Sequence, residues 1–184
     1  MTTHGICIPN KIAATSIDSL NRSAVSAATD IDNGWCVALS TKSTTSGQSE
    51  VWTATEPATG TLANLWMAYS PEIVVTTSGT YVYKGLDPDP RNFINLATYV
   101  FDTFKPQVND IITLTADCLA GSKASNTFVN ATDSTGGYKL YWGATQTASV
   151  LSLYLLATTY ISIGTGAIDN QRVTAYQFEV VGIN

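Results

Sequence analysis

The stretch from Asp87 to Thr115, DPDPRNFINLATYVFDTFKPQVNDIITLT, holds the clearest helix pattern of the chain and leads into a strand. Asp89 can cap the start of a helix, and Pro90 stands where a first-turn proline is tolerated. Apolar residues then recur at steps of three and four, which places them on one helical face: Phe93, Leu96, Ala97, Val100, Phe101 and Phe104. The pattern predicts one amphipathic α-helix at about 90–104, followed by a strand at 111–115.

Outside this stretch the sequence is typical of strands separated by turns. DIDNG at 30–34 is a strong turn signal, because Asn-Gly favours the positive φ angles of a tight turn. Apolar or alternating runs predict strands at 35–39, 50–54, 65–69, 73–76, 81–84, 138–142, 150–157, 160–163 and 172–181. The first two strands are expected to form a hairpin, and the most apolar run, 150–157, is a candidate for a central strand. The predicted fold class is mainly β, an antiparallel sandwich or barrel-like domain on which the helix packs.

Two segments depart from this pattern of strands. Residues 1–28 contain apolar residues without periodicity, and they predict an extended N-terminal arm that a partner holds in place. The candidate partner-binding residues of this arm are Ile6, Ile8, Ile12, Ile17 and Leu20. Residues 29–184 are expected to form a single β-rich domain, with an exposed loop insertion at about 117–137, where the sequence is polar and contains several glycines.

Composition limits the functions that are open to the chain. Of its 184 residues, 45% are hydrophobic and only 12% are charged, which suits a β-rich protein whose surface is largely covered by neighbours. The net charge is −5 and the nine lysines and arginines are scattered, so nucleic-acid binding has no electrostatic basis. No apolar run reaches membrane-spanning length and the start lacks the pattern of a signal peptide, so we expect neither a membrane association nor secretion.

Residue types that carry catalysis or bind metals are sparse. His4 is the single histidine and lies in a polar N-terminal segment, which argues against a Ser-His-Asp or Cys-His mechanism. Cys7, Cys36 and Cys118 have no metal-type spacing, and a core position is the simplest role for Cys36. We therefore expect no enzyme activity, no catalytic residue, no metal site and no cofactor.

Carboxylate chemistry and carbohydrate binding are the alternatives that the residues leave open. Asp30 and Asp32 could bind calcium, or one of them could form half of a glycosidase pair. The second carboxylate of such a pair would come from Glu50 or Glu72. Capping of the turn before Gly34 explains the two aspartates more simply. Carbohydrate would bind through exposed aromatic side chains, and the candidate contacts are Trp52, Tyr83 and Tyr141.

Five motifs of turns and strands follow one another along the chain: TDIDNGWCVAL at 29–39, EVWTATEP at 50–57, LWMAYSPEIVV at 65–75, NDIITLTAD at 109–117 and AYQFEVVG at 175–182. Their order resembles the head decoration proteins of tailed bacteriophages, which are also described as capsid auxiliary or cement proteins. The resemblance implies a non-enzymatic structural protein that is made in the host cytoplasm and binds the major capsid protein on the outer surface of the virion. It also implies stabilisation of the shell, often by a trimer or by single copies at lattice junctions. The longer segment 117–137 and the low charge depart from the pattern of that family.

Other classes of function are weighed beside this one. The chain could be another virion structural protein, such as a head fibre, tail or minor capsid protein. It could also be a carbohydrate-binding β-module, or a hydrolase that uses two carboxylates. A capsid gene next to the gene of this chain would favour decoration, whereas binding to immobilised polysaccharide would favour the β-module.

Overall fold

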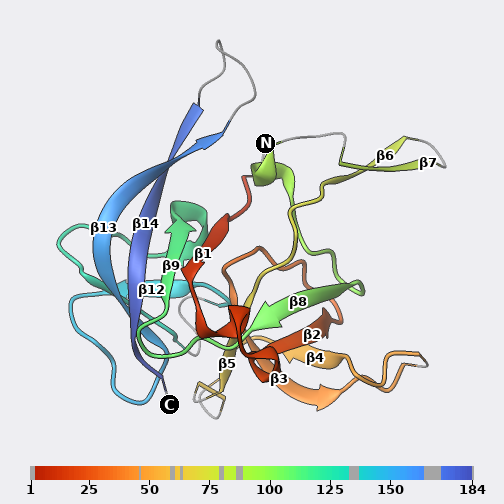
Figure 1. Cartoon of the computed structure of the whole chain (residues 1–184), viewed down its shortest axis with the longest axis horizontal. Coiled ribbons are helices and arrows are strands. Elements are labelled where there is room, and N and C mark those ends of the chain that lie inside the picture. Colours follow the sequence, from red (N-terminus) through yellow and green to blue (C-terminus); the bar gives the residue numbers. More distant parts are fainter. Residues whose placement is uncertain are drawn as a thin grey trace.

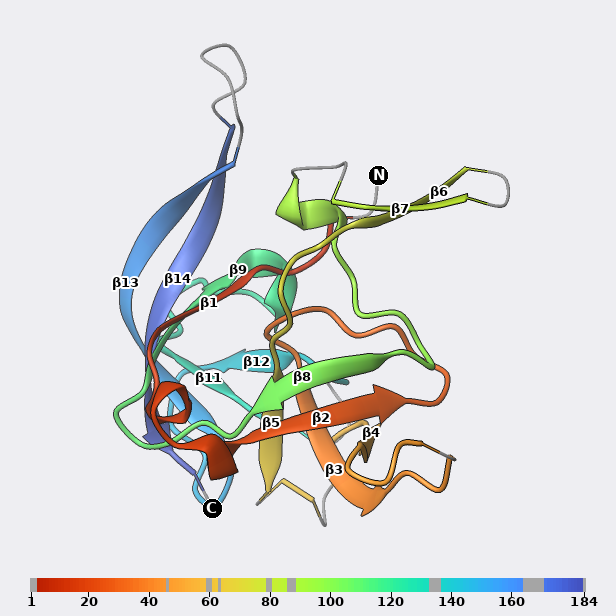
Figure 2. The ribbon, with the colours of Figure 1, turned by 45° about the vertical axis from the view of Figure 1, so that its right-hand side comes forward.

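The computed structural model of the chain describes residues 3–45, 47–58, 61–62, 64–78, 81–85, 89–132, 137–163 and 171–183. Over these residues the chain is mainly β, and it folds into two layers, a seven-stranded sheet and a closed barrel (Figure 1). The expected mainly β, sandwich-like architecture is therefore confirmed. A separate two-stranded ribbon, β6–β7, extends from the body of the molecule (Figure 2).

The elements have the following order and bounds. The seven-stranded sheet has the strand order β1 (Cys7–Lys11), β9 (Ile111–Thr115), β14 (Gln171–Gly182), β13 (Ser152–Ile163), β11 (Phe128–Asn130), β12 (Leu140–Gly143) and β10 (Leu119–Ala120). The barrel has the order β2 (Asn21–Ser26), β4 (Trp52–Thr55), β3 (Cys36–Lys42), β5 (Leu65–Ala68) and β8 (Val100–Phe104), which pairs back to β2. The separate ribbon is β6 (Val75–Ser78) with β7 (Tyr81–Lys84). Short 3-10 turns are η1 (Ala13–Thr15), η2 (Asp18–Leu20), η3 (Pro90–Asn92) and η4 (Ala116–Cys118).

Two hydrophobic cores hold the layers together, one between the sheet and the barrel and one inside the barrel. Strands β3 and β5 contribute to both cores, since Val37 belongs to the barrel core and Ala38 to the core between the layers. Side chains alternate along a strand, so a strand that lies between two cores must be apolar on both faces. This explains the uninterrupted apolar runs at 36–39 and 65–68, which are buried at every position.

The prediction of a helix at about 90–104 is wrong, because the structure has a short turn and a strand there. The Asp89 side chain does accept a hydrogen bond from the Arg91 backbone N–H at 2.9 Å, as a cap would, but the turn that follows it is only η3. Strand β8 occupies 100–104 and pairs with both β2 and β5, which closes the barrel. Between the two elements, Thr98 has a φ of 68°, a left-handed conformation in which a right-handed helix cannot continue.

The three-and-four spacing of apolar residues in this stretch has a different origin. Phe101 and Phe104 are both buried in β8, one in the barrel core and the other between the layers, whereas Val100 is exposed. Asn95 is buried and exchanges two backbone hydrogen bonds with Ile31. Pairing with distant segments therefore decides the conformation, because a stretch rich in asparagine, threonine and aromatic residues has little intrinsic helix propensity to oppose it.

Phe101→Ala is expected to lower the free energy of unfolding by about 3–5 kcal/mol, because it removes a buried aromatic ring from the barrel core. Val100 supplies a matched control. A helix would place both residues on the core face, but the strand exposes Val100, so Val100→Ala should change the free energy of unfolding by only about 0.5 kcal/mol. Denaturant titration of the two variants measures both values. Equal losses at the two positions would contradict the strand.

The N-terminal segment 1–28 does not form a separate arm over its described residues, which begin at residue 3. It is extended in β1 and β2, as predicted, but β1 pairs with β9 in the sheet, and β2 pairs with β8 and β4 in the barrel. Backbone N–H and C=O groups of the segment thus find their partners inside the chain, where the prediction had placed them on another molecule. The segment is part of both layers.

The loop insertion predicted at about 117–137 is exposed over only part of its length. It contains the end of η4 and the short strands β10 and β11, and its exposed residues between 117 and 132 fall within 121–127. Residues 133–136 lie outside the described residues. Asn130 is buried despite its polarity, because its side-chain oxygen accepts a hydrogen bond from the Ser152 hydroxyl at 2.7 Å. Pairing of this kind cannot be recognised from polarity alone.

A buried polar junction forms at the predicted Asn-Gly turn. The Asn33 amide nitrogen donates to the Ser70 carbonyl at 2.9 Å, and the Asn33 side-chain oxygen accepts from the Ser70 backbone N–H at 3.0 Å. The same oxygen accepts from the Asn95 amide nitrogen at 3.1 Å. Gly34 has a φ of 85°, which confirms the turn, and a Cβ there would lie 2.9 Å from Leu114 Cδ2. The turn therefore joins three chain segments and packs on the sheet.

Candidate functional site

The three aromatic residues expected to contact carbohydrate lie in three different sheets. Trp52 is in β4, Tyr83 in β7 and Tyr141 in β12. The guanidinium carbon of Arg22 lies 4.2 Å from the centroid of the Trp52 ring, so that face of the indole is already covered. The Tyr141 ring is half-buried and lies against Gly121, where a Cβ would be 2.9 Å from the ring. Tyr83 is exposed, and the structure does not bring the three residues together into one platform.

The candidate partner-binding residues of the N-terminal segment divide between the core and the surface. Ile6 is buried, and Ile12 and Leu20 pack partly against the core between the layers. Ile8 and Ile17 are exposed. Contact with the chain's own core accounts for the first three residues, which leaves Ile8 and Ile17 as the members of the set that another molecule can reach.

The acidic residues considered for metal binding or hydrolysis are engaged in separate contacts. Asp32 is buried, and its Oδ1 lies 2.9 Å from His4 Nδ1. Asp30 accepts a hydrogen bond from the Ala97 backbone N–H at 2.7 Å, so contacts with distant segments explain the two aspartates better than capping of the nearby turn. Glu50 forms an exposed ion pair at the β3–β4 hairpin. In the part of the chain that the structure describes, no group of three or more histidine, cysteine or acidic side chains is placed to hold a metal ion.

The cysteines are buried and free, which confirms the core position predicted for Cys36. Burial raises the pKa of Cys36 and the pKa of Cys118 to about 12 each. Burial also raises the pKa of Cys7 well above its ordinary value. The thiols are therefore neutral at physiological pH, and a neutral thiol is a poor nucleophile and metal ligand.

We expect the three thiols of the native protein to stay unreacted with a chromogenic disulfide reagent at about pH 8, because they are both inaccessible and protonated. The same protein in concentrated guanidinium chloride should release three equivalents of the chromophore, one for each cysteine. The absorbance of the released thiol measures both reactions. Rapid release of one equivalent from the native protein would reveal an accessible thiolate and contradict the burial.

A long ribbon formed by β13 and β14 rises from the body (Figure 1, Figure 2). In the described part of the chain, β11 borders β13 only at 152–154, and β9 borders β14 only at 175–179. Beyond these limits, residues 156–163 and 171–174 have strand partners only in each other among the strands that the structure describes. We call this part the projecting ribbon. Both of its edges are open to a strand from another molecule.

The projecting ribbon carries the core-facing side of the sheet past the end of the core. Phe178 pairs with Leu155 and is buried between the layers. Alternate residues continue this side to Tyr176, whose ring is half-buried and lies 5.2 Å from the Trp142 ring centroid. One further step along the same side reaches Tyr160, which is 61% exposed. Beyond Tyr176 this side is mainly polar, with Thr158, Ser162 and Thr174, so Tyr160 stands out as an exposed aromatic side chain that a second molecule can contact.

Beyond Ala157, the edge of β13 lacks the features that normally prevent pairing with another chain. Natural edge strands are protected by charges, prolines or bulges, or are very short. β13 is 12 residues long, and its sequence, SLYLLATTYISI, contains no charged residue, proline or glycine. Bulges interrupt its register with β14 between Ser152 and Leu153 and between Leu155 and Ala157, and the pairing beyond them is regular as far as Ile163. The projecting part of the edge therefore offers an uninterrupted row of backbone donors and acceptors.

A second exposed apolar surface lies at the base of the β6–β7 ribbon. It is a groove of about 380 Å³, lined mainly by residues 92–100 together with residues that flank the ribbon. Its exposed apolar lining residues are Ile73, Leu96, Tyr99 and Val100. In both views the projecting ribbon rises upward at the left of the molecule, whereas the β6–β7 ribbon runs to the right (Figure 1, Figure 2). Exposed apolar side chains therefore occur at two places, on the projecting ribbon and in this groove.

Comparison with known proteins assigns no family to the chain. No protein-family model, no curated protein and no solved structure matches it. Among the helices that the structure describes, none is long and apolar enough to cross a membrane.

Proposed function

We propose that the chain is a structural protein of a bacteriophage virion that binds the outer surface of the capsid and stabilises it, with the major capsid protein as its partner. The observation that supports this proposal most is the projecting ribbon, because its open edges are suited to strand addition by a neighbouring subunit. The order of sequence motifs described above supports the same class of protein. The role is structural and requires no turnover.

An isolated chain gains little stability from a projecting two-stranded ribbon. A two-stranded hairpin is at best marginally stable in water without a third strand or a packed layer. A neighbouring strand would satisfy the open edge and would cover Tyr160 together with Leu156, which is 43% exposed. Repeated over many symmetry-related copies, such contacts would stabilise the assembled shell through mass action, because they form only in the assembled state.

Surface chemistry also supports a covered, outward position. Only 12% of the residues are charged, so little desolvation free energy opposes burial of the threonine-rich strands against another subunit. The net charge of −5 suits the outside of a shell, because the inside faces packaged DNA of the same sign. Self-association as a trimer on the shell is compatible with both observations.

Particles that lack the protein test this function. We expect them to assemble, to rupture at a lower temperature or under a milder osmotic shock than complete particles, and to regain their resistance when the purified protein is added back. The added protein should saturate at one fixed ratio to the major capsid protein. Particles that are equally robust with and without the protein, or that never assemble without it, would each contradict a stabilising role. Location of the protein on the tail by electron microscopy would favour the alternative of another virion component.

A further inference from the structure

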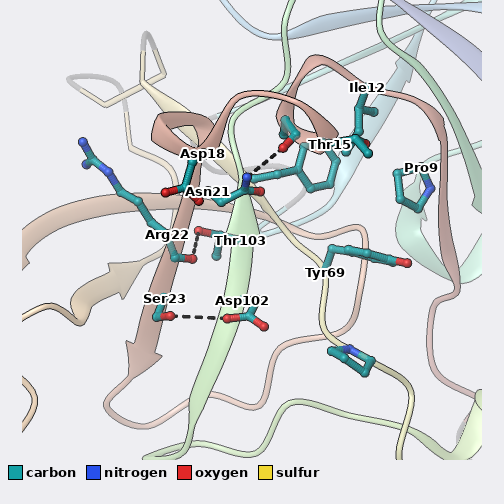
Figure 3. Close-up of a pocket in the computed structure, with 13 residues that line it drawn as sticks. Pro9, Ile12, Thr15, Asp18, Asn21, Arg22, Ser23, Tyr69, Asp102 and Thr103 are labelled. Atoms are coloured by element: carbon teal, nitrogen blue, oxygen red, sulfur yellow. Dashed lines mark hydrogen bonds between the residues drawn. The ribbon is translucent and has the colours of Figure 1, made fainter.

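A polar cleft opens between the N-terminal segment and one side of the barrel (Figure 3). Its volume is about 750 Å³, and it is lined by residues of three segments, 9–23, 69–71 and 102–104. Pockets for small molecules commonly have volumes of about 300–1,000 Å³ and combine apolar walls with a few fixed polar groups. The cleft has this character, and it shares none of its lining with the projecting ribbon.

The polar lining of the cleft offers hydrogen-bond acceptors that the chain itself uses little. Asp18 and Asp102 are both exposed. Asp102 Oδ1 accepts a long hydrogen bond from the Ser23 hydroxyl, at 3.3 Å, and its second oxygen has no hydrogen-bond partner among the described residues. The carboxylate of Asp18 likewise has no hydrogen-bond partner among the residues that the structure describes. Two carboxylates with spare acceptor capacity favour a ligand that brings several O–H donors.

Arg22 is the cationic residue of the lining, and its guanidinium group stacks on two indole rings. Arg22 lies with its guanidinium carbon 4.2 Å from the ring centroid of Trp52 and 4.6 Å from that of Trp66. Figure 3 shows its side chain pointing away from Tyr69, on the far side of the cleft. Stacking of the guanidinium on two indoles makes it a poor anchor for an anion, and the two carboxylates repel one. The cleft is therefore unsuited to phosphates and other anionic ligands.

Tyr69 supplies a fixed aromatic surface beside these acceptors. Its ring is 38% exposed and packs edge-on against the buried Phe104 ring, with centroids 6.3 Å apart and an interplanar angle of 83°. Its backbone N–H donates to the Asp102 carbonyl at 2.9 Å, which holds the backbones of the two residues side by side. Partial burial raises the pKa of the Tyr69 hydroxyl, so it stays protonated and can both donate and accept a hydrogen bond.

We propose that this cleft binds a short neutral saccharide. Sugar rings present O–H donors along their edges, which match the spare oxygens of Asp18 and Asp102, and an apolar C–H face, which matches the exposed ring of Tyr69. A cation would also be attracted by the carboxylates and by the face of the ring, and the comparison with spermidine separates that ligand from a saccharide. The proposal assigns to the chain a ligand-binding role in addition to shell binding, on different residues, so either role can fail without the other.

Titration of the full chain with neutral trisaccharides tests the proposal, with saturation-transfer NMR as the readout. The probes are maltotriose, cellotriose and triacetylchitotriose, with sialyllactose as the anionic comparison and spermidine as the cationic one. At least one neutral probe should bind more tightly than both comparisons. Tyr69→Ala and Asp102→Asn should each weaken its binding about tenfold or more, which corresponds to about 1.4 kcal/mol. Tyr99→Ala removes an exposed tyrosine outside the cleft and should leave the affinity unchanged.

The variants also separate loss of the site from loss of the fold. Because Tyr69 packs on Phe104, Asp18→Asn serves as a further variant at an exposed position and should weaken binding in a chain with an unaltered melting temperature. Absence of binding by every neutral probe would overturn the proposal. Tighter binding of spermidine or sialyllactose, or equal affinity in all the variants, would overturn it as well.

Discussion

Asn33→Ala is expected to lower the free energy of unfolding by about 3–5 kcal/mol, which is a large part of the stability of an ordinary domain. Asn33 is fully buried, and its amide bonds both the N–H and the carbonyl of Ser70. Alanine would leave these two backbone groups without partners in the interior, at a cost of about 1–3 kcal/mol each. Asn95, whose amide also bonds Asn33, would keep its second bond, to the Ile31 carbonyl.

A surface asparagine supplies the control for this prediction. The Asn126 amide donates to the Ser122 carbonyl at 2.9 Å in an exposed position, so water can replace the lost partner. Asn126→Ala should therefore change the free energy of unfolding by only about 0.5 kcal/mol. Denaturant titrations of the two variants give the comparison. A loss at Asn33 as small as that at Asn126 would show that the junction does not hold the three segments together.

Tyr160→Lys is expected to weaken binding to capsid shells by about a hundredfold or more while leaving the isolated chain folded. Tyr160 is 61% exposed, so the free protein solvates a lysine there easily. In the proposed bound state, that position lies at the centre of a covered ribbon, where an unpaired ammonium carries a large desolvation penalty. Cosedimentation of the variant with shells that lack the protein measures the affinity, and circular dichroism monitors the fold.

The matched control for this variant is an apolar residue away from both ribbons. Val108 is 46% exposed in the turn between β8 and β9. Val108→Lys introduces the same charge and removes a comparable exposed side chain, and it should leave the affinity for shells unchanged. Equal affinity of the Tyr160 variant and the wild type would contradict a role for the projecting ribbon in shell binding, whatever the effect of the Val108 variant.

Most strands could be predicted from the sequence because alternation and turn chemistry are local signals. The strands at 81–84 and 111–115 match the predicted bounds, and Gly34 adopts the positive φ that the Asn-Gly turn requires. The helix at 90–104 could not be rejected in this way. The segment forms a strand because β2 and β5, which are distant in the sequence, pair with β8. The left-handed backbone conformation of Thr98 also has no sequence signature.

The candidate site was predictable only in part. The strand runs at 150–157 and 160–163 were recognised, and the first proves to be central, since β13 lies between β14 and β11. Their fusion into one long strand agrees with the absence of proline and glycine between Ser152 and Ile163. The open edges were not predictable, because they depend on where β9 and β11 stop. The cleft beside Tyr69 likewise exists only once the N-terminal segment folds against the barrel.

In the proposed complex, a neighbouring strand covers the projecting ribbon in the assembled shell. Hydrogen–deuterium exchange at residues 156–163, measured in the free protein and in the shell-bound protein, tests for this strand. We expect amides of this segment that exchange freely in the isolated chain to become protected on the shell, because a third strand accepts hydrogen bonds from the open edge of β13. Amides of 121–127, which are largely exposed and belong to no strand, serve as an internal reference. Unchanged exchange at 156–163 in protein that is demonstrably bound to the shell would contradict strand addition to the projecting ribbon.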